Sequence, residues 1–247
     1  MRTLWTFGCS FTAEYDPIDG IFFPFENDFD KYKKWRGGNL PPVWPTILGN
    51  KLNCKVMNCA VGGSSNYNIF NQFINVCELI KKDDIVIFGW TNLSRFISVN
   101  MDENIFTQIL VSENNFGGTG FSKRTIEEIM YNRSHPLWAL EVNQWMRFIN
   151  VYLNNIGAYN FYWTADETIF NQHTIQDDEQ KYIVVRDNQS TKTNLLGYLN
   201  LPMFFGGVLR ARIVEETNGI VIDDHMGEFG HKNQAEYFYK HIIKNIK

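Results

Sequence analysis

The sequence lacks the features that mark membrane, nucleic-acid-binding and zinc proteins. It has no uninterrupted apolar run of about 18 residues, so no segment predicts a transmembrane helix. With 23 Lys and Arg against 27 Asp and Glu, its formal net charge of −4 offers no attraction to nucleic acid. Its four cysteines form no Cys-x-x-Cys pair and have no zinc spacing with histidine. We therefore expect no membrane, nucleic-acid or metal partner.

Internal repeats, low-complexity tracts and a signal-peptide pattern are absent as well. The first residues, MRTLWTFGCSF, lack the basic, apolar and small-residue regions of a signal peptide and predict a strand instead. Cysteines without a disulfide framework suit reduced thiols. We therefore expect a reducing compartment, the cytoplasm, with association with a virion as an alternative.

What the sequence does contain is an alternation of strand and helix patterns, typical of a parallel sheet. Its 247 residues, 44% hydrophobic and 15% aromatic, suit one α/β domain over 1–247. The expected strands are 2–8, 55–58, 84–90, 158–163 and 219–222. The expected helices are 44–52, 66–82, 136–155 and 227 onward, and loop insertions are expected near 11–45, 92–135 and 165–215. The predicted fold is a three-layer α/β/α sandwich with a five-stranded parallel sheet, similar to flavodoxin.

Polar and small residues follow the carboxyl end of four of these strands. The four segments are Gly8-Cys9-Ser10, Asn58 to Asn66 (NCAVGGSSN), Gly89-Trp90-Thr91-Asn92 and Asp223-Asp224-His225. Open parallel sheets place their active sites at this edge. The segments therefore predict one site that contains a hydroxyl, backbone amides, an amide side chain and a carboxylate–imidazole pair.

These groups are the ones that acyl transfer needs. Ser10 would attack a carbonyl carbon, His225 would accept its proton, and Asp223 would orient the imidazole. The oxyanion would be held by the backbone N–H groups of Ser10 and Gly63 and by the amide of Asn92. Glycine at 63 would let the backbone approach the substrate oxygen closely.

The order and spacing of the four segments resemble the SGNH hydrolases, also called GDSL-like esterases. The first block of that family is Gly-Asp-Ser-Leu, here GCSF, and its second has a glycine five residues after an asparagine, here Asn58 and Gly63. Its third is Gly-x-Asn-Asp and its last is Asp-x-x-His. The resemblance spans residue 4 to about residue 240 and is greatest to SGNH-type proteins of phages and marine bacteria. It implies an esterase that needs no metal or organic cofactor.

Two blocks depart from the family pattern and leave alternatives open. In the third block Thr91 stands at the position of the family asparagine, and Asn92 follows one residue later. Either side chain is a candidate third oxyanion donor. In the last block the aspartate precedes the histidine by two residues, so that Asp223 and Asp224 are both candidates to orient His225.

Other residues compete for these roles or are candidates for substrate contact. Cys9 is a rival nucleophile and His231 a rival base. Asn66, Thr91 and Arg95 are candidate substrate-binding residues, although Asn66 also suits the start of the helix over 66–82.

The function expected from these residues is removal of a short acyl group, such as acetyl, from a carbohydrate or other small ester. Two alternatives are a non-catalytic structural or carbohydrate-binding protein of a virion, with an assembly partner, and an O-acyltransferase. The sequence names neither the acyl group nor the alcohol.

Overall fold

The chain contains both helices and strands. The computed structural model describes residues 1–15, 28–91, 95–100, 105–110, 135–164, 212–223 and 225–246, with only the backbone for 95–100, 105–110, 135–140, 143 and 164. The strands are β1 (Thr3–Phe7), β2 (Lys55–Asn58), β3 (Ile85–Trp90), β4 (Arg95–Asn100), β5 (Ile105–Leu110) and β6 (Tyr159–Thr164). The helices are α1 (Asp28–Trp35), α2 (Trp44–Leu52), α3 (Asn66–Ile74), α5 (His135–Ile156), α7 (Ile213–Glu216) and α8 (Glu228–Ile242), with a 3-10 turn at Cys77–Leu79.

Four of the described strands form one parallel sheet in the order β2-β1-β3-β6. Near its carboxyl end, β1 pairs Thr6 with Asn58 of β2 and Phe7 with Phe88 of β3. Strand β1 therefore lies inside the sheet, and the chain winds away from it in both directions. In open α/β sheets, ligands bind beyond the carboxyl ends of the strands at such a point.

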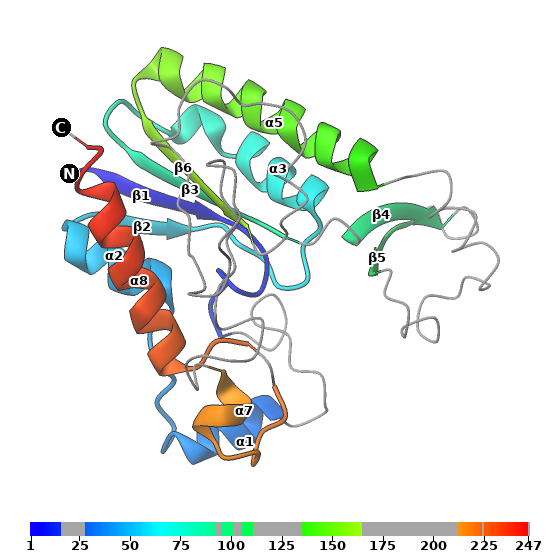
Figure 1. Cartoon of the computed structure of the whole chain (residues 1–247), viewed down its shortest axis with the longest axis vertical. Coiled ribbons are helices and arrows are strands. Elements are labelled where there is room, and N and C mark those ends of the chain that lie inside the picture. Colours follow the sequence, from blue (N-terminus) through cyan, green and yellow to red (C-terminus); the bar gives the residue numbers. More distant parts are fainter. Residues whose placement is uncertain are drawn as a thin grey trace, which may run out of the picture.

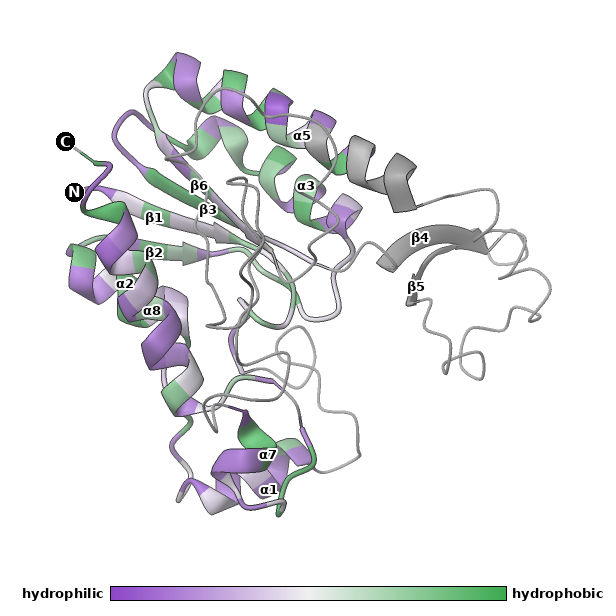
Figure 2. Ribbon diagram, viewed as in Figure 1, coloured by the Kyte–Doolittle hydropathy of each residue, from purple (hydrophilic) through white to green (hydrophobic). Residues whose placement is uncertain are grey.

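Helices cover both faces of the sheet, α3 and α5 on one and α2 and α8 on the other (Figure 1). Because side chains alternate along a strand, Val86 and Phe88 pack toward α3 and α5, whereas Ile85 and Ile87 pack toward α2 and α8. The helices that pack on the two faces of the sheet carry both polar and apolar residues (Figure 2). The predicted α/β class with a parallel sheet is confirmed.

The predicted strand at 219–222 is wrong. These residues form a turn and a bend after α7, with Gly219 at φ 79°. The backbone N–H of Val221 donates to the Thr217 hydroxyl at 3.1 Å, and Ile220, expected inside a sheet, is 59% exposed. Hydrogen bonds between residues close along the chain stabilise a turn here, although the short apolar pattern predicts a strand. The described part of the sheet therefore has four strands rather than the predicted five.

The regions predicted as loop insertions contain regular structure. Helix α1 lies within 11–45, α7 begins within 165–215, and β4 and β5 form an antiparallel hairpin within 92–135. The hairpin stands apart from the parallel sheet in Figure 1. The helix predicted over 66–82 ends at Ile74, and the 3-10 turn follows it.

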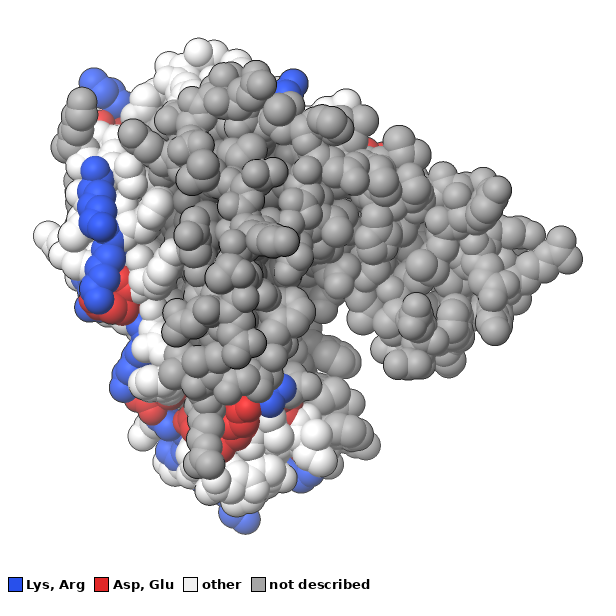
Figure 3. All heavy atoms as spheres, in the orientation of Figure 1, with Lys and Arg blue, Asp and Glu red and all other residues white. Residues whose placement is uncertain are grey.

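Acidic and basic side chains are interspersed on the described part of the surface drawn in Figure 3. Arg36 illustrates the pattern, because it forms ion pairs with Glu216 at 2.9 Å and Glu228 at 2.7 Å. These bonds join α1 to α7 and α8. Across the described residues, no helix has the length and apolar character needed to cross a membrane.

Candidate active site

A tight turn after β1 carries Ser10. The backbone N–H groups of Thr12 and Ala13 both donate to the carbonyl of Cys9, at 2.8 and 3.0 Å, and this closes the turn. Gly8 is required there, because a Cβ at that position would lie 2.5 Å from the hydroxyl oxygen of Thr12. The glycine before the serine therefore reflects a close approach of the backbone to a side chain.

The loop that carries Asp223 and His225 is fixed by the beginning of α7. The first N–H groups of a helix have no partner within the helix. Here the N–H of Ile213 donates to the carbonyl of His225, and the N–H of Val214 donates to the carbonyl of Asp223, both at 2.9 Å. No sequence pattern predicts this contact, which joins α7 to the loop through their backbones.

Ser10, His225 and Asp223 form a continuous chain of hydrogen bonds. His225 Nε2 lies 2.7 Å from Ser10 Oγ, and His225 Nδ1 lies 2.9 Å from Asp223 Oδ1. Because an ionised carboxylate only accepts, Nδ1 carries the proton and Nε2 accepts from the serine hydroxyl. Ser10 and Asp223 are each 1% exposed, whereas the side chain of His225 is 15% exposed. The geometry is that of a nucleophile, a base and a group that orients the base.

Two further contacts hold the imidazole in place. The backbone N–H of His225 donates to Asp223 Oδ1 at 2.7 Å, so one carboxylate oxygen accepts from both the backbone and the ring. The ring of Phe11 lies against the ring of His225, with 4.8 Å between their centroids. Asp223 thus occupies the orienting position. Asp224, the alternative, lies outside the described residues.

The rival nucleophile and the rival base do not take part in this chain of hydrogen bonds. Cys9 is buried, and in the described structure no hydrogen bond joins it to His225. His231 is fully buried in α8, and its Nδ1 accepts from the backbone N–H of Trp44 at 3.2 Å. Burial, together with the nearby His225, lowers the pKa of His231 to about 3. His231 is therefore neutral at ordinary pH and attaches the beginning of α2 to α8.

His231 should make the fold sensitive to acid. Its pKa is about 3 in the folded protein but about 6.5 in an unfolded chain, so the unfolded state binds the proton more tightly between these values. Stability is therefore lost as the pH falls below about 6.5, by about 2 kcal/mol from this residue at pH 5. Urea unfolding at pH 7 and pH 5 measures the loss.

The matched variant is His231→Asn, whose side-chain oxygen can accept from the Trp44 N–H without a titrating group. We expect this variant to lose about 2 kcal/mol less than the wild type between the two pH values. An equal loss in both proteins would contradict the assignment.

Two backbone segments meet where an oxyanion would form. The N–H of Ser10 donates to no group among the described residues. The loop that carries Gly63 approaches the same turn, because the N–H of Val61 donates to the carbonyl of Gly8 at 3.2 Å. Gly63 has φ 73°, in the left-handed region that favours glycine. The predicted donors Ser10 and Gly63 thus belong to adjoining segments, while Asn92 lies outside the described residues.

Asn66 binds the backbone of the third block. Its side-chain oxygen accepts from the N–H of Thr91 at 2.8 Å, and its side-chain nitrogen donates to the carbonyl of Thr91 at 3.0 Å. The substrate contact of Asn66 stays a prediction, and the start of α3 is capped by Ser65, whose hydroxyl accepts from the N–H of Asn68. Thr91 is 5% exposed, and Arg95 begins β4, where only the backbone is described.

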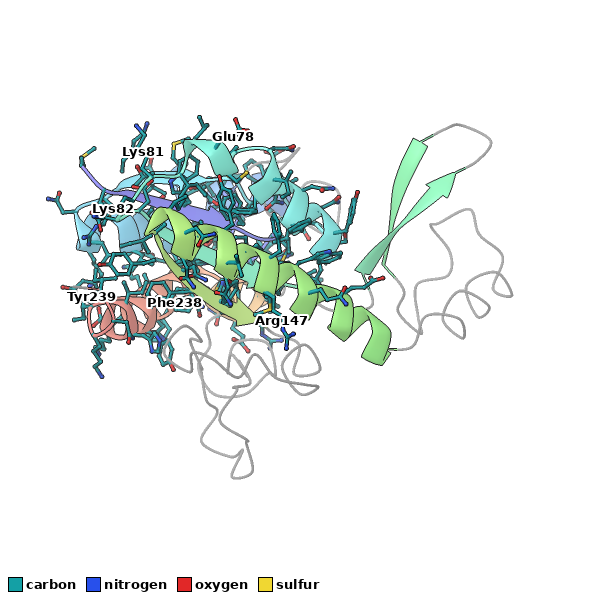
Figure 4. All side chains as sticks on the ribbon, turned by 90° about the horizontal axis from the view of Figure 1, so that it is seen from above. Glu78, Lys81, Lys82, Arg147, Phe238 and Tyr239 are labelled. Carbon is teal, nitrogen blue, oxygen red and sulfur yellow. The ribbon has the colours of Figure 1, made fainter. Side chains whose placement is uncertain are left out.

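A separate hollow of about 730 Å³ lies at the opposite, amino-terminal edge of the sheet. Lys81 and Lys82, which line it, lie on the side of the molecule away from the β4–β5 hairpin (Figure 4). Its buried carboxylate, Asp84, already accepts from the N–H groups of Thr3 and Lys81 and from the indole of Trp5. These bonds give Asp84 a structural role.

The chemistry available at the Ser10 edge is nucleophilic attack assisted by a base. Over the described part of the chain, no three His, Cys, Asp or Glu side chains gather as metal ligands. A search of known family models finds none that matches this chain, and a search of curated proteins finds no match either.

Proposed function

We propose that the protein is a serine esterase of the SGNH type, which hydrolyses short acyl esters. The observation that carries the proposal is the Ser10–His225–Asp223 chain, whose links of 2.7 and 2.9 Å join a turn after β1 to a loop more than 200 residues later. A parallel sheet with helices on both faces is also the core of a three-layer SGNH-type fold, and we include that family in the proposal.

The reaction proceeds in two halves. Ser10 Oγ attacks the acyl carbon while its proton passes to His225 Nε2, and the negative charge on Asp223 stabilises the imidazolium. The oxyanion accepts hydrogen bonds from the backbone N–H groups of Ser10 and Gly63. The C–O bond to the alcohol then breaks as His225 returns the proton to the leaving oxygen. Water, deprotonated by His225, then attacks the acyl carbon, the bond between that carbon and Ser10 Oγ breaks, and His225 returns the proton to Oγ as the acid is released.

Reaction with a fluorophosphonate tests the proposal without knowledge of the substrate. An activated serine attacks the phosphorus and displaces fluoride, whereas an ordinary buried serine does not. We expect the wild type to gain one adduct, and peptide mass spectrometry to place it on Ser10. The His225→Ala variant, which lacks the base but keeps Ser10, is the control and should label far more slowly. No adduct on the folded wild type would contradict the proposal.

A further inference from the structure

Gln72 connects the two backbone segments of the candidate site. It is half-buried in the last turns of α3. Its side-chain oxygen accepts from the N–H of Gly8 at 3.1 Å, and its side-chain nitrogen donates to the carbonyl of Gly8 at 3.1 Å. The same nitrogen donates to the hydroxyl of Ser64 at 3.0 Å. One amide group thus contacts the residue two positions before Ser10 and the residue directly after Gly63.

These contacts form a closed network with the loop that carries Gly63. The Ser64 hydroxyl donates to the carbonyl of Val61 at 2.8 Å, and the N–H of Val61 donates to the carbonyl of Gly8 at 3.2 Å. The carbonyl of Gly8 therefore accepts from both Val61 and Gln72. Such a network fixes the distance between the Ser10 turn and the Gly63 loop.

We infer that Gln72 is a positioning residue, which holds the hydroxyl of Ser10 and the oxyanion-binding N–H of Gly63 at a fixed distance from each other. The inference rests on the proposed esterase function and adds to it a residue that lies outside the four sequence motifs. Its physical basis is the transition state, in which the attacking oxygen of Ser10 and the oxyanion of the substrate are bonded to the same carbon atom. A displacement of about 1 Å between the groups that bind these atoms can lower the rate about 10²-fold.

Only an amide of this length fits the network. Its oxygen must accept from the Gly8 N–H, while its nitrogen must supply two protons, to the Gly8 carbonyl and to the Ser64 hydroxyl. A glutamate of the same shape has no proton to donate near neutral pH and would place a carboxylate oxygen against the carbonyl of Gly8. A methionine of similar size would remove all three bonds without adding charge.

The test compares Gln72→Glu and Gln72→Met with Asn71→Asp in hydrolysis of p-nitrophenyl acetate. Asn71, the preceding residue of α3, makes no side-chain hydrogen bond to the described residues, so Asn71→Asp changes an amide to a carboxylate without touching the network. We expect kcat to fall about 10²-fold in Gln72→Glu and less in Gln72→Met, with KM within about threefold of the wild type, because the lost contacts act in the transition state. Asn71→Asp should keep the wild-type kcat.

Folding is checked by circular dichroism. If Gln72→Glu does not fold, the activity of Gln72→Met tests the inference. Wild-type kcat in a folded Gln72→Met variant, or an equal loss in Asn71→Asp, would overturn the inference. A wild type without turnover would instead contradict the esterase proposal. Hydrogen exchange then decides about Gln72: faster exchange over 8–13 in Gln72→Met than in Asn71→Asp supports the positioning role, and equal exchange overturns it.

Discussion

Replacing Ser10 by alanine is expected to abolish ester hydrolysis, with a fall in kcat of at least about 10⁴-fold. In the proposed mechanism the variant removes the atom that accepts the acyl group, while His225 and Asp223 stay in place and the imidazole has no hydroxyl to deprotonate. The missing hydroxyl leaves the fold intact, because the turn is closed by backbone bonds to Cys9. Hydrolysis of p-nitrophenyl acetate by the wild type and the variant measures the loss.

Cys9→Ala is the matched control, since it removes a nucleophilic group from the adjacent residue of the same turn. Its backbone carbonyl, which closes the turn, is unchanged by the substitution. We expect activity within a few-fold of the wild type. If Ser10→Ala keeps its activity and Cys9→Ala loses it, the nucleophile is the thiol.

The second large effect is expected at Asp223, where two substitutions separate orientation from charge. Alanine removes both functions, and kcat should fall about 10⁴-fold, as expected when the orienting member of a triad is lost. Asparagine should cost only about 10²-fold, because hydrogen bonds to charged groups contribute about 1.5–3 kcal/mol and this variant loses the charge alone. The geometry explains the difference: Oδ1 accepts from the backbone N–H of His225 and from its ring, so an amide oxygen must occupy this position.

Steady-state kinetics of the two Asp223 variants test whether the carboxylate orients His225 through Oδ1. If Asp223→Asn is as inactive as Asp223→Ala, the amide nitrogen faces the imidazole and the backbone contact does not fix the side chain. Activity close to wild type in Asp223→Ala would assign the orienting role to Asp224.

The sequence by itself predicted the elements whose residues decide their own conformation. The β-branched and aromatic run over 84–90 predicted the strand found at Ile85–Trp90, buried on both faces. Pro45 in the first turn predicted the helix found at Trp44–Leu52. The alternation of such elements was enough for the α/β class, because hydrophobic periodicity is a local property.

The order of the motifs also predicted which end of the sheet to consider. Ser10 follows β1 and Thr91 follows β3, and neighbouring parallel strands end at the same edge. The structure places His225 against Ser10 at that edge. The segment 219–222, by contrast, has the composition of a strand but forms a turn, because its backbone N–H groups bond to Val214 and Thr217, which lie at most five residues away along the chain.

Only the tertiary structure decided which polar side chains face the candidate site and which hold the backbone. Asn66 and Gln72 both bind backbone groups of residues more than 20 positions away, Thr91 and Gly8. His231 resembles a base in the sequence but is buried in α8, where it binds the first residue of α2 and is kept neutral. A side chain's partner depends on which segments the packed core brings together, and neither residue type nor spacing along the chain contains that information.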